Sequence, residues 1–195
     1  MKRLLITGFD PFGGADINPS WEAVKLLPDV IGDWELTKLE IPTVFGLAAQ
    51  TVLDVATELC PDAVICVGQA GGRDAVTLEV FGVNLQHARI KDNAGNQPLA
   101  VPIVQGERAS HRATIPVLEM VRAVREQDLP CRLSYSAGRF VCNDLLYTLL
   151  QYYQKSSTKV GFIHVPYLPE QAKDGQPSMS IEQIVKALTI SIQAM

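Results

Sequence analysis

The sequence predicts an α/β fold: a single domain, residues 1–195, with an open, mostly parallel twisted sheet and helices on both faces. Short apolar runs such as RLLIT (Arg3 to Thr7) and AVICV (Ala63 to Val67) alternate with segments of helical periodicity. Runs that are apolar at every position are typical of strands covered on both faces. A chain of 195 residues also fills one core but is too short for two ordinary domains.

The first half of the chain predicts three strands and two helices. The strands are expected from apolar runs or from apolar/polar alternation, and the helices from apolar residues three or four positions apart. Pro residues and an N-cap residue mark the helix ends. In order, we expect a strand at Arg3 to Thr7, a helix capped by Asn18 and ending near Leu27, a half-exposed strand near a sheet edge at Glu35 to Ile41, a helix at Gly46 to Cys60, and a central strand at Ala63 to Val67.

The second half continues the alternation. VTLEVFGVNLQ has strand composition, the polar segment after it is rich in turn residues, and SIEQ has the spacing of a capping box. In order, we expect a strand at Val76 to Gln86, a loop at His87 to Pro98, a helix at Pro116 to Gln127, a strand at Cys131 to Tyr135 leading through a turn to a helix ending at Tyr153, a strand at Lys159 to Val165, and a helix that begins at Ser180.

Composition and charge narrow the class of protein. Lys and Arg total 17 against 21 Asp and Glu, a net charge of -4, and no basic block is present, so a nucleic-acid partner is disfavoured. The apolar run at the N-terminus is too short for a signal peptide, and no segment approaches a membrane span. We therefore expect a cytoplasmic protein with reduced cysteines. The cysteine spacing lacks a C-x-x-C pair or a neighbouring His, so a zinc site is not expected.

The segment LSYSAGRFVCNDLLYTLLQYY places Cys142 where a Gly-containing turn becomes a helix. Unpaired backbone N–H groups at a helix start favour a thiolate, so the pattern predicts a lowered thiol pKa and a nucleophile. The alternative is a small buried apolar residue, which is the commoner role for a cysteine. Cys60, Cys66 and Cys131 are interpreted as structural.

Other candidate residues also follow predicted strands. Phe9 and Phe12 lie in a loop where apolar side chains are scarce, Gln69 follows the central strand, and His164 ends a later one. In parallel sheets, ligands bind outside the carboxyl ends of the strands, so these residues and Cys142 are expected on one rim. The aromatic rings would line a small neutral pocket. Alternatively, both rings and the histidine belong to the core.

Two charged residues have ambiguous settings. Glu79 interrupts a predicted strand, which usually indicates a solvated edge position, but its apolar neighbours favour a covered carboxylate that needs a partner. With Cys142 as nucleophile and His164 as base, Glu79 would be the third group, which orients the imidazole of His164. Arg89, in the loop that follows, is either a site cation or a solvated surface residue.

Four segments resemble the characteristic segments of the pyroglutamyl peptidase I family, the pyrrolidone-carboxylate peptidases, which are cysteine peptidases. They occur in order over nearly the whole chain: TGFDPFGG with the following NPS, GQAGGR at Gly68 to Arg73, SAGRFVCN at Ser136 to Asn143, and FIHVPYLPEQ at Phe162 to Gln171.

The resemblance implies a Cys142, His164 and Glu79 triad that hydrolyses the bond after an N-terminal pyroglutamyl residue through a thioester. It also implies Arg89 beside the backbone N–H of Cys142 at the oxyanion, Phe9 and Phe12 around the lactam ring, and a homo-oligomer, a dimer or tetramer. Gln69 would contact the ring amide. Departures from the family pattern flank the triad: Val80, His87, and Arg139 with Phe140.

Two alternatives stay open at this point. The same three side chains could serve another Cys-dependent amidase or acyl transferase on the same scaffold. A non-catalytic binding module with a merely buried cysteine is the other.

Overall fold

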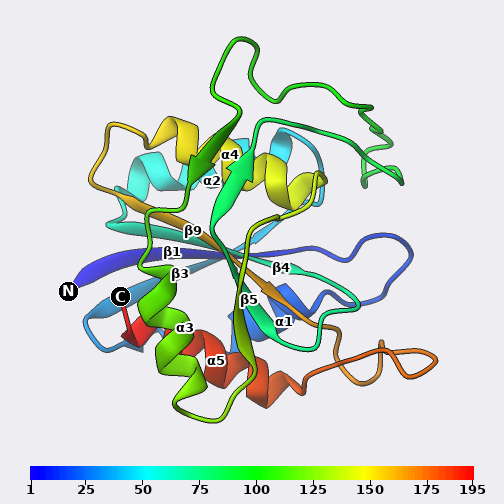
Figure 1. Cartoon of the computed structure of the whole chain (residues 1–195). Coiled ribbons are helices and arrows are strands. Elements are labelled where there is room, and N and C mark those ends of the chain that lie inside the picture. Colours follow the sequence, from blue (N-terminus) through cyan, green and yellow to red (C-terminus); the bar gives the residue numbers. More distant parts are fainter.

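The computed structural model describes all residues, 1–195, and is built on a seven-stranded sheet between two layers of helices (Figure 1). Helices α2 and α4 cover one face, and α1, α3 and α5 cover the other. None of the helices is long and apolar enough to cross a membrane. In chain order the elements are β1 (Lys2–Phe9), α1 (Pro19–Leu26), β2 (Val30–Ile31), β3 (Trp34–Ile41), α2 (Leu47–Leu59), β4 (Ala63–Gln69), β5 (Val76–Glu79), β6 (Phe81–Val83), β7 (Ser110–Arg112), α3 (Val117–Arg125), β8 (Cys131–Ser134), α4 (Val141–Tyr152), β9 (Lys159–Val165) and α5 (Ile181–Gln193).

The strand order in the large sheet is β2-β3-β1-β4-β9-β5-β8. Strands β3, β1, β4 and β9 are parallel, β2 is antiparallel to β3 at one edge, and β5 runs against β9 while pairing in parallel with β8. The predicted α/β class, with a mostly parallel sheet and helices on both faces, is confirmed.

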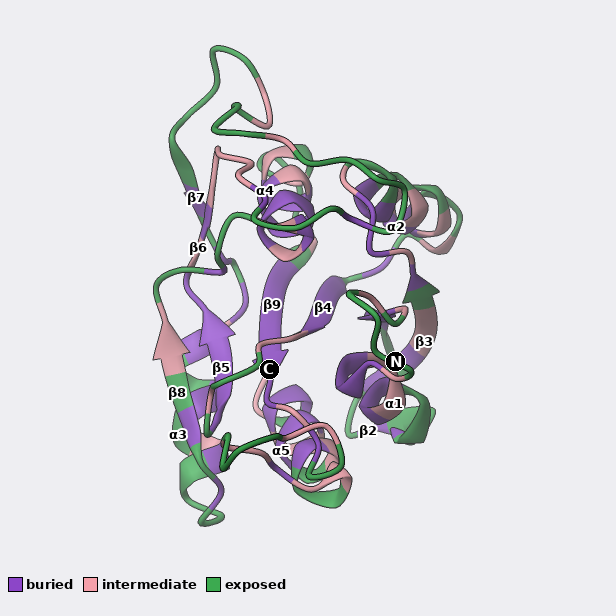
Figure 2. Cartoon of the chain, turned by 90° about the vertical axis from the view of Figure 1, so that its right-hand side faces the viewer, coloured by how far each residue is buried: buried purple, intermediate pink, exposed green.

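Two apolar cores lie on opposite faces of the sheet, because alternate residues of each strand point to opposite sides. Leu4 and Ile6 of β1 join the larger core, of 30 buried residues, under α1, α3 and α5. Leu5 and Phe9 join the smaller core, of 17 residues, under α2 and α4. Figure 2 shows the central strands β4 and β9 buried along most of their length. Their apolar composition follows from this double coverage.

The predicted helix starts agree with the structure. The Asn18 side chain accepts a hydrogen bond from the Ser20 N–H, and Pro19 occupies the first turn of α1. Ser180 and Gln183 form the reciprocal capping box of α5. Helix α4 begins at Val141, so Cys142 lies in its first turn as expected.

The single strand predicted at Val76 to Gln86 is wrong. After Glu79 the chain leaves the large sheet, and β6 pairs instead with β7, a strand that the sequence did not predict. Gly82 of β6 lies so close to α4 that a Cβ there would stand 2.9 Å from the Tyr147 backbone. The segment between β6 and β7 extends away from the sheet beyond α4 (Figure 1).

Candidate active site

A buried histidine and a buried glutamate are paired near the ends of the neighbouring strands β9 and β5. His164 Nδ1 lies 2.7 Å from Glu79 Oε1, and the two residues are 3% and 0% exposed. His164 is in register with Gly68 of β4 and with Thr77 of β5. Because residues two apart on a strand share a face, Glu79 projects on the same side as Thr77 and His164. The pair leaves the imidazole Nε2 without a hydrogen bond inside the protein.

Cys142 is brought to this pair by the start of α4. Its sulfur lies against Gly68, since a Cβ on that glycine would stand 3.0 Å from Sγ. Gly68 is the register partner of His164, so sulfur and imidazole lie over adjacent strands on one face. The Cys142 N–H makes no backbone hydrogen bond, as expected in a first helical turn.

The route by which Cys142 reaches the rim differs from the expected one. The strand before it, β8, runs opposite to β9, so its carboxyl end does not meet those of β1, β4 and β9. The loop between β8 and α4 brings the chain back over the sheet. The candidates at the carboxyl ends of β1, β4 and β9 share a rim because these strands are parallel, whereas Cys142 reaches it through this loop.

Arg73 is a site residue that sequence reasoning missed. Its Nη1 lies 2.8 Å from Glu79 Oε1, in an ion pair whose carboxylate is fully buried. The same nitrogen donates to the Thr77 hydroxyl, and Nη2 donates to the Ser136 carbonyl at 3.3 Å. The signal was present, because a covered Glu79 needs a cation and Arg73 is six residues upstream.

The pKa values of the histidine and glutamate are both lowered. Burial lowers the pKa of His164; its hydrogen bond to Glu79 works the other way, and the charge of Arg73 adds to the lowering. Burial acts to raise the pKa of Glu79, but His164, together with Ser134 and Arg73, outweighs burial and brings it below its usual value. The glutamate is therefore ionised and the imidazole neutral at neutral pH.

The expected lowering of the Cys142 pKa is wrong. Burial, with Glu79 and Cys66 nearby, raises the pKa of the thiol to about 12, and Arg73 and the helix N–H only partly offset this. Burial of the sulfur and the negative charge of Glu79 outweigh the helix terminus. The thiol and imidazole are thus both neutral in the free protein, and the sulfur must lose its proton during the attack.

The two aromatic candidates have different surroundings. Phe9 is 2% exposed and packs on Phe162 of the smaller core, with ring centres 6.3 Å apart. Phe12 is half-buried and lies 6.0 Å from Phe140, which contacts Phe45 edge to face at 5.2 Å. The structure therefore leaves Phe9 in the core and Phe12 in a row of three rings at the surface.

Phe12 and Gln69 line one cavity of about 670 Å³ together with Ile90. The side-chain oxygen Oε1 of Gln69 accepts a hydrogen bond from the Gln171 side chain at 3.2 Å, which fixes the orientation of the Gln69 amide. Gln171 also donates to the Ile17 carbonyl. The charged residues Asp16, Glu170 and Lys173 line the same cavity, so only part of its wall is uncharged.

Arg89 is not brought to the sulfur. Its side chain is exposed and makes no hydrogen bond or ion pair. The loop around it is nevertheless ordered by Asp92, whose carboxylate accepts from the backbone N–H groups of Phe45, Ala94 and Asn96.

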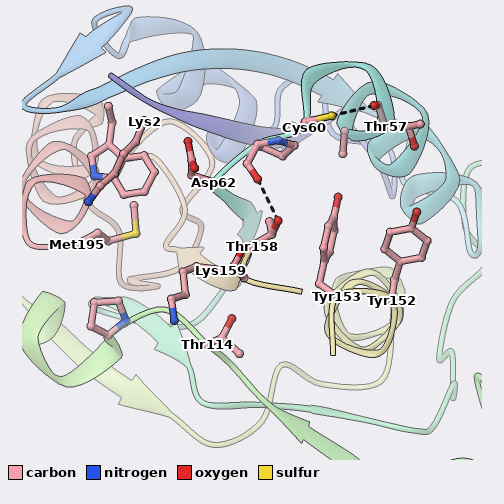
Figure 3. Close-up of a pocket in the computed structure, with 15 residues that line it drawn as sticks. Lys2, Thr57, Cys60, Asp62, Thr114, Tyr152, Tyr153, Thr158, Lys159 and Met195 are labelled. Atoms are coloured by element: carbon pink, nitrogen blue, oxygen red, sulfur yellow. Dashed lines mark hydrogen bonds between the residues drawn. The ribbon is translucent and has the colours of Figure 1, made fainter. Parts of the chain in front are cut away.

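A larger cavity lies elsewhere. It measures about 880 Å³ and is found at the opposite end of the sheet, where β1, β4 and β9 begin (Figure 3). Lys2, Asp62, Lys159 and the exposed Cys60 line it, and none of the predicted site residues does. Cavity size therefore does not identify the reactive centre in this protein.

Fold and side chains together define a class: an α/β protein that holds a cysteine, a histidine and a glutamate at one rim of its sheet, as cysteine hydrolases do. The chain belongs to the pyroglutamyl peptidase family, whose model matches residues 2–195. It is 44% identical to a pyrrolidone-carboxylate peptidase of Bacillus cereus strain AH820, over 99% of this chain and 92% of that protein. The resemblance seen in the sequence is confirmed.

Solved structures of relatives agree over the whole chain. Pyroglutamyl peptidase I of Bacillus amyloliquefaciens superposes with a TM-score of 0.96 at 42% identity, covering 100% of this chain and 96% of that one. The pyrrolidone carboxyl peptidase of Thermococcus litoralis gives 0.95 at 33% identity, covering 100% and 93%.

Proposed function

We propose that this chain is a pyroglutamyl peptidase I, a cysteine omega-peptidase that hydrolyses the bond after an N-terminal pyroglutamyl residue. Cys142 is the nucleophile, His164 the general base and acid, and Glu79 the group that orients the imidazole. The observation that supports this most directly is the 2.7 Å contact between His164 and Glu79 beside the Cys142 sulfur. No metal or cofactor takes part in the proposed reaction.

The first half of the reaction forms a thioester. Glu79 accepts the Nδ1 proton of His164, so Nε2 presents a lone pair. As Sγ attacks the pyroglutamyl carbonyl carbon, Nε2 takes the thiol proton and the carbonyl electron pair moves to oxygen. When the intermediate collapses, the C–N bond breaks and the leaving amine takes the proton from His164. The free peptide departs, and the acyl group stays on sulfur.

Water completes the cycle. His164 removes a proton from a water molecule as its oxygen attacks the thioester carbonyl. Collapse breaks the C–S bond, the proton on His164 returns to sulfur, and pyroglutamate leaves. In both halves the free N–H of Cys142 faces the developing oxyanion, a contact worth about 3 kcal/mol per donor at comparable sites. Arg89 is the second proposed donor, and its exposed side chain has to turn inward when substrate binds.

The cavity beside Gln69 is suited to an uncharged ring. A pyroglutamyl residue has no amino charge, and Phe12, Ile90 and Gln69 form an uncharged part of the cavity wall. The Gln69 amide can pair with the lactam amide, while Phe9 supports the loop from the core side. A ring that lacks the lactam amide would lose this pairing with the Gln69 side chain, which is the physical basis of selectivity.

The test is release of a fluorophore from a pyroglutamyl amide by the purified, reduced protein. A prolyl amide is the control substrate, and Cys142→Ser is the control variant. Cleavage limited to the lactam substrate and lost with Cys142 supports both reaction and nucleophile. A folded, reduced sample that leaves the lactam substrate intact contradicts the proposal.

The wider assignments also belong to this proposal: residues 1–195 as one peptidase domain in the cytoplasm, acting on pyroglutamyl peptides as a dimer or tetramer. Four free cysteines without a disulfide are consistent with a reducing compartment. Exposed apolar side chains on the segment between β6 and β7, among them Leu99 and Val101, are consistent with self-association. Light scattering on the eluted protein measures the oligomeric state.

A further inference from the structure

Two donors share one oxygen of the buried Glu79 carboxylate. His164 Nδ1 lies 2.7 Å and Arg73 Nη1 2.8 Å from Oε1, whereas Oε2 is buried without a hydrogen-bond partner. A carboxylate held mainly through one oxygen can rotate if one of these contacts is lost. Arg73 therefore helps to fix the plane of the Glu79 carboxylate.

Arg73 also connects the carboxylate to the loop that leads to Cys142. Its Nη2 donates to the Ser136 carbonyl at 3.3 Å, and Ser136 lies in the turn between β8 and α4. The guanidinium thus contacts β5 through Thr77 and Glu79, and the loop before the nucleophile through Ser136. A planar fork with several donors can make these contacts at once, and a lysine ammonium cannot match that geometry.

No other cation replaces Arg73 at this position. The nearby Arg132 pairs with Asp74 at the surface, where both side chains are about half or more exposed, at 49% and 64%. Arg89 is exposed and unpaired. Glu79 makes its only ion pair with an arginine or lysine through Arg73.

We propose that Arg73 is a positioning residue of the reactive centre, one that holds the Glu79 carboxylate in the orientation that sets the His164 ring and joins this pair to the loop before Cys142. The inference rests on the proposed function, which assigns roles to the three residues but none to Arg73.

Arg73 also affects the pKa values of Glu79, His164 and Cys142. Its charge lowers the pKa of both His164 and Cys142, and its hydrogen bond lowers that of Glu79. The titratable or charged groups that face the pair from the surrounding elements are Cys66 of β4, Cys142 of α4 and Arg73 of the β4–β5 turn, and β8 adds only the Ser134 hydroxyl. Removal of the guanidinium therefore raises the His164 pKa, and the base is protonated over a wider acid range.

The experiment compares Arg73→Gln, Arg73→Lys and the matched control Arg132→Gln, which breaks only the surface pair. kcat and KM for a pyroglutamyl amide are measured across pH, with thermal unfolding of each variant. For Arg73→Gln we expect kcat to fall about 10- to 100-fold, as for other residues that orient reactive groups, while KM changes less than about threefold. The acid limb of kcat/KM moves up by roughly one pH unit.

Arg73→Lys separates charge from geometry. Because lysine retains the positive charge, we expect the acid limb of the kcat/KM pH profile to stay near its position in the parent protein. Because lysine lacks the planar guanidinium with its several donors, we expect kcat to stay reduced. Arg73→Lys also tests the positioning role of Arg73 if Arg73→Gln does not fold. A parent-like kcat and acid limb in Arg73→Gln, or in its absence a parent-like kcat in Arg73→Lys, overturns the proposal.

A second readout does not depend on the substrate. In a Cys60→Ser background, alkylation of Cys142 by iodoacetamide at pH 8 is followed by intact mass. Loss of the positive charge raises the thiol pKa, so we expect Arg73→Gln to react at least about threefold more slowly, with Arg132→Gln unchanged. If the parent cleaves no pyroglutamyl amide but this difference appears, the proposed function fails and the inference about Arg73 stands. An unchanged alkylation rate counts against Arg73 whatever the substrate.

Discussion

At the scale of single residues, Gly68 shows how closely the site is packed. A Cβ at this position would stand 2.8 Å from the Phe162 ring and 3.0 Å from the Cys142 sulfur. Both distances are below ordinary contact, so any side chain here displaces either the ring under His164 or the nucleophile.

The prediction is that Gly68→Ala lowers kcat/KM by at least about 10-fold, because a shift of under 1 Å spoils attack geometry. Gly161→Ala is the matched control: on neighbouring β9, its Cβ would meet the Ile115 side chain in the other core. The control should lose about 1 to 3 kcal/mol of stability while keeping kcat/KM. Kinetics and urea unfolding on both variants check this, and equal kinetic losses would contradict it.

The thiol of Cys142 gives a second prediction at this scale. Because burial raises its pKa, the free protein has little thiolate at pH 7, and alkylation of Cys142 in Cys60→Ser protein should rise only at alkaline pH. A small-molecule thiol with a pKa of about 8.5 is the reference. Replacing Cys60 is necessary, because that thiol is exposed and reacts as well. A reactive plateau reached already near pH 6 would mean a thiolate at rest.

At the scale of elements, Asn143 links α4 to β6, one of the two strands that pair outside the large sheet. Its side chain is fully buried, accepts from the Val83 N–H at 2.9 Å, and donates to the Val83 and Leu85 carbonyls. One side chain thus satisfies three backbone groups of a segment that has left the large sheet. The contact also fixes the residue adjacent to Cys142.

Asn143→Ala should reduce the free energy of unfolding by about 2 to 4 kcal/mol, because three backbone groups lose their partner in a buried setting. The matched control is Gln50→Ala on α2, an exposed amide that bonds only Asp54 and should change stability by less than about 0.5 kcal/mol. Urea unfolding measures both. A loss for Asn143→Ala no larger than for the control would show that water replaces these bonds.

Elements were predictable where the local pattern determines them. The buried strands β1, β4 and β9 follow from unbroken apolar runs, and α1 and α5 from their capping residues. β7, with the sequence SHR, has no such pattern and exists only because β6 lies beside it. The direction of β8 depends on its pairing with β5, which no local pattern encodes.

The same contrast between local sequence pattern and contacts made only in the folded chain applies to the candidate site. Cys142 and His164 could be selected because each follows a strand or turn that the sequence predicts. Arg73 could not be assigned with the same ease, since its role depends on contacts with Thr77, Glu79 and Ser136 that only the folded chain creates. The prediction for the thiol pKa is wrong for a related reason: the helix terminus is visible in the sequence, but the burial of the sulfur beside Glu79 is not.

At the scale of the whole molecule, the buried His164–Glu79 pair couples folding to pH. Both groups have a folded-state pKa below the value in an unfolded chain, about 6.5 for His and 4.3 for Glu. The unfolded chain therefore binds more protons as pH falls through each window, and stability rises with pH there. The histidine acts first, from about pH 6.5 downward, and the glutamate below about pH 4.3.

We therefore expect the protein to lose on the order of 1 kcal/mol more stability than His164→Gln when the pH is lowered from 7.5 to 5.5. Glutamine retains an amide donor for Glu79 but does not titrate, so the comparison isolates the histidine, and His87 and His111 are present in both proteins and cancel. Urea unfolding at the two pH values gives the four free energies. If the variant loses as much stability as the parent, the imidazole is not the group that burial keeps neutral. A steeper loss in the variant would mean that the imidazole binds its proton more tightly in the folded state, with the Glu79 hydrogen bond outweighing burial.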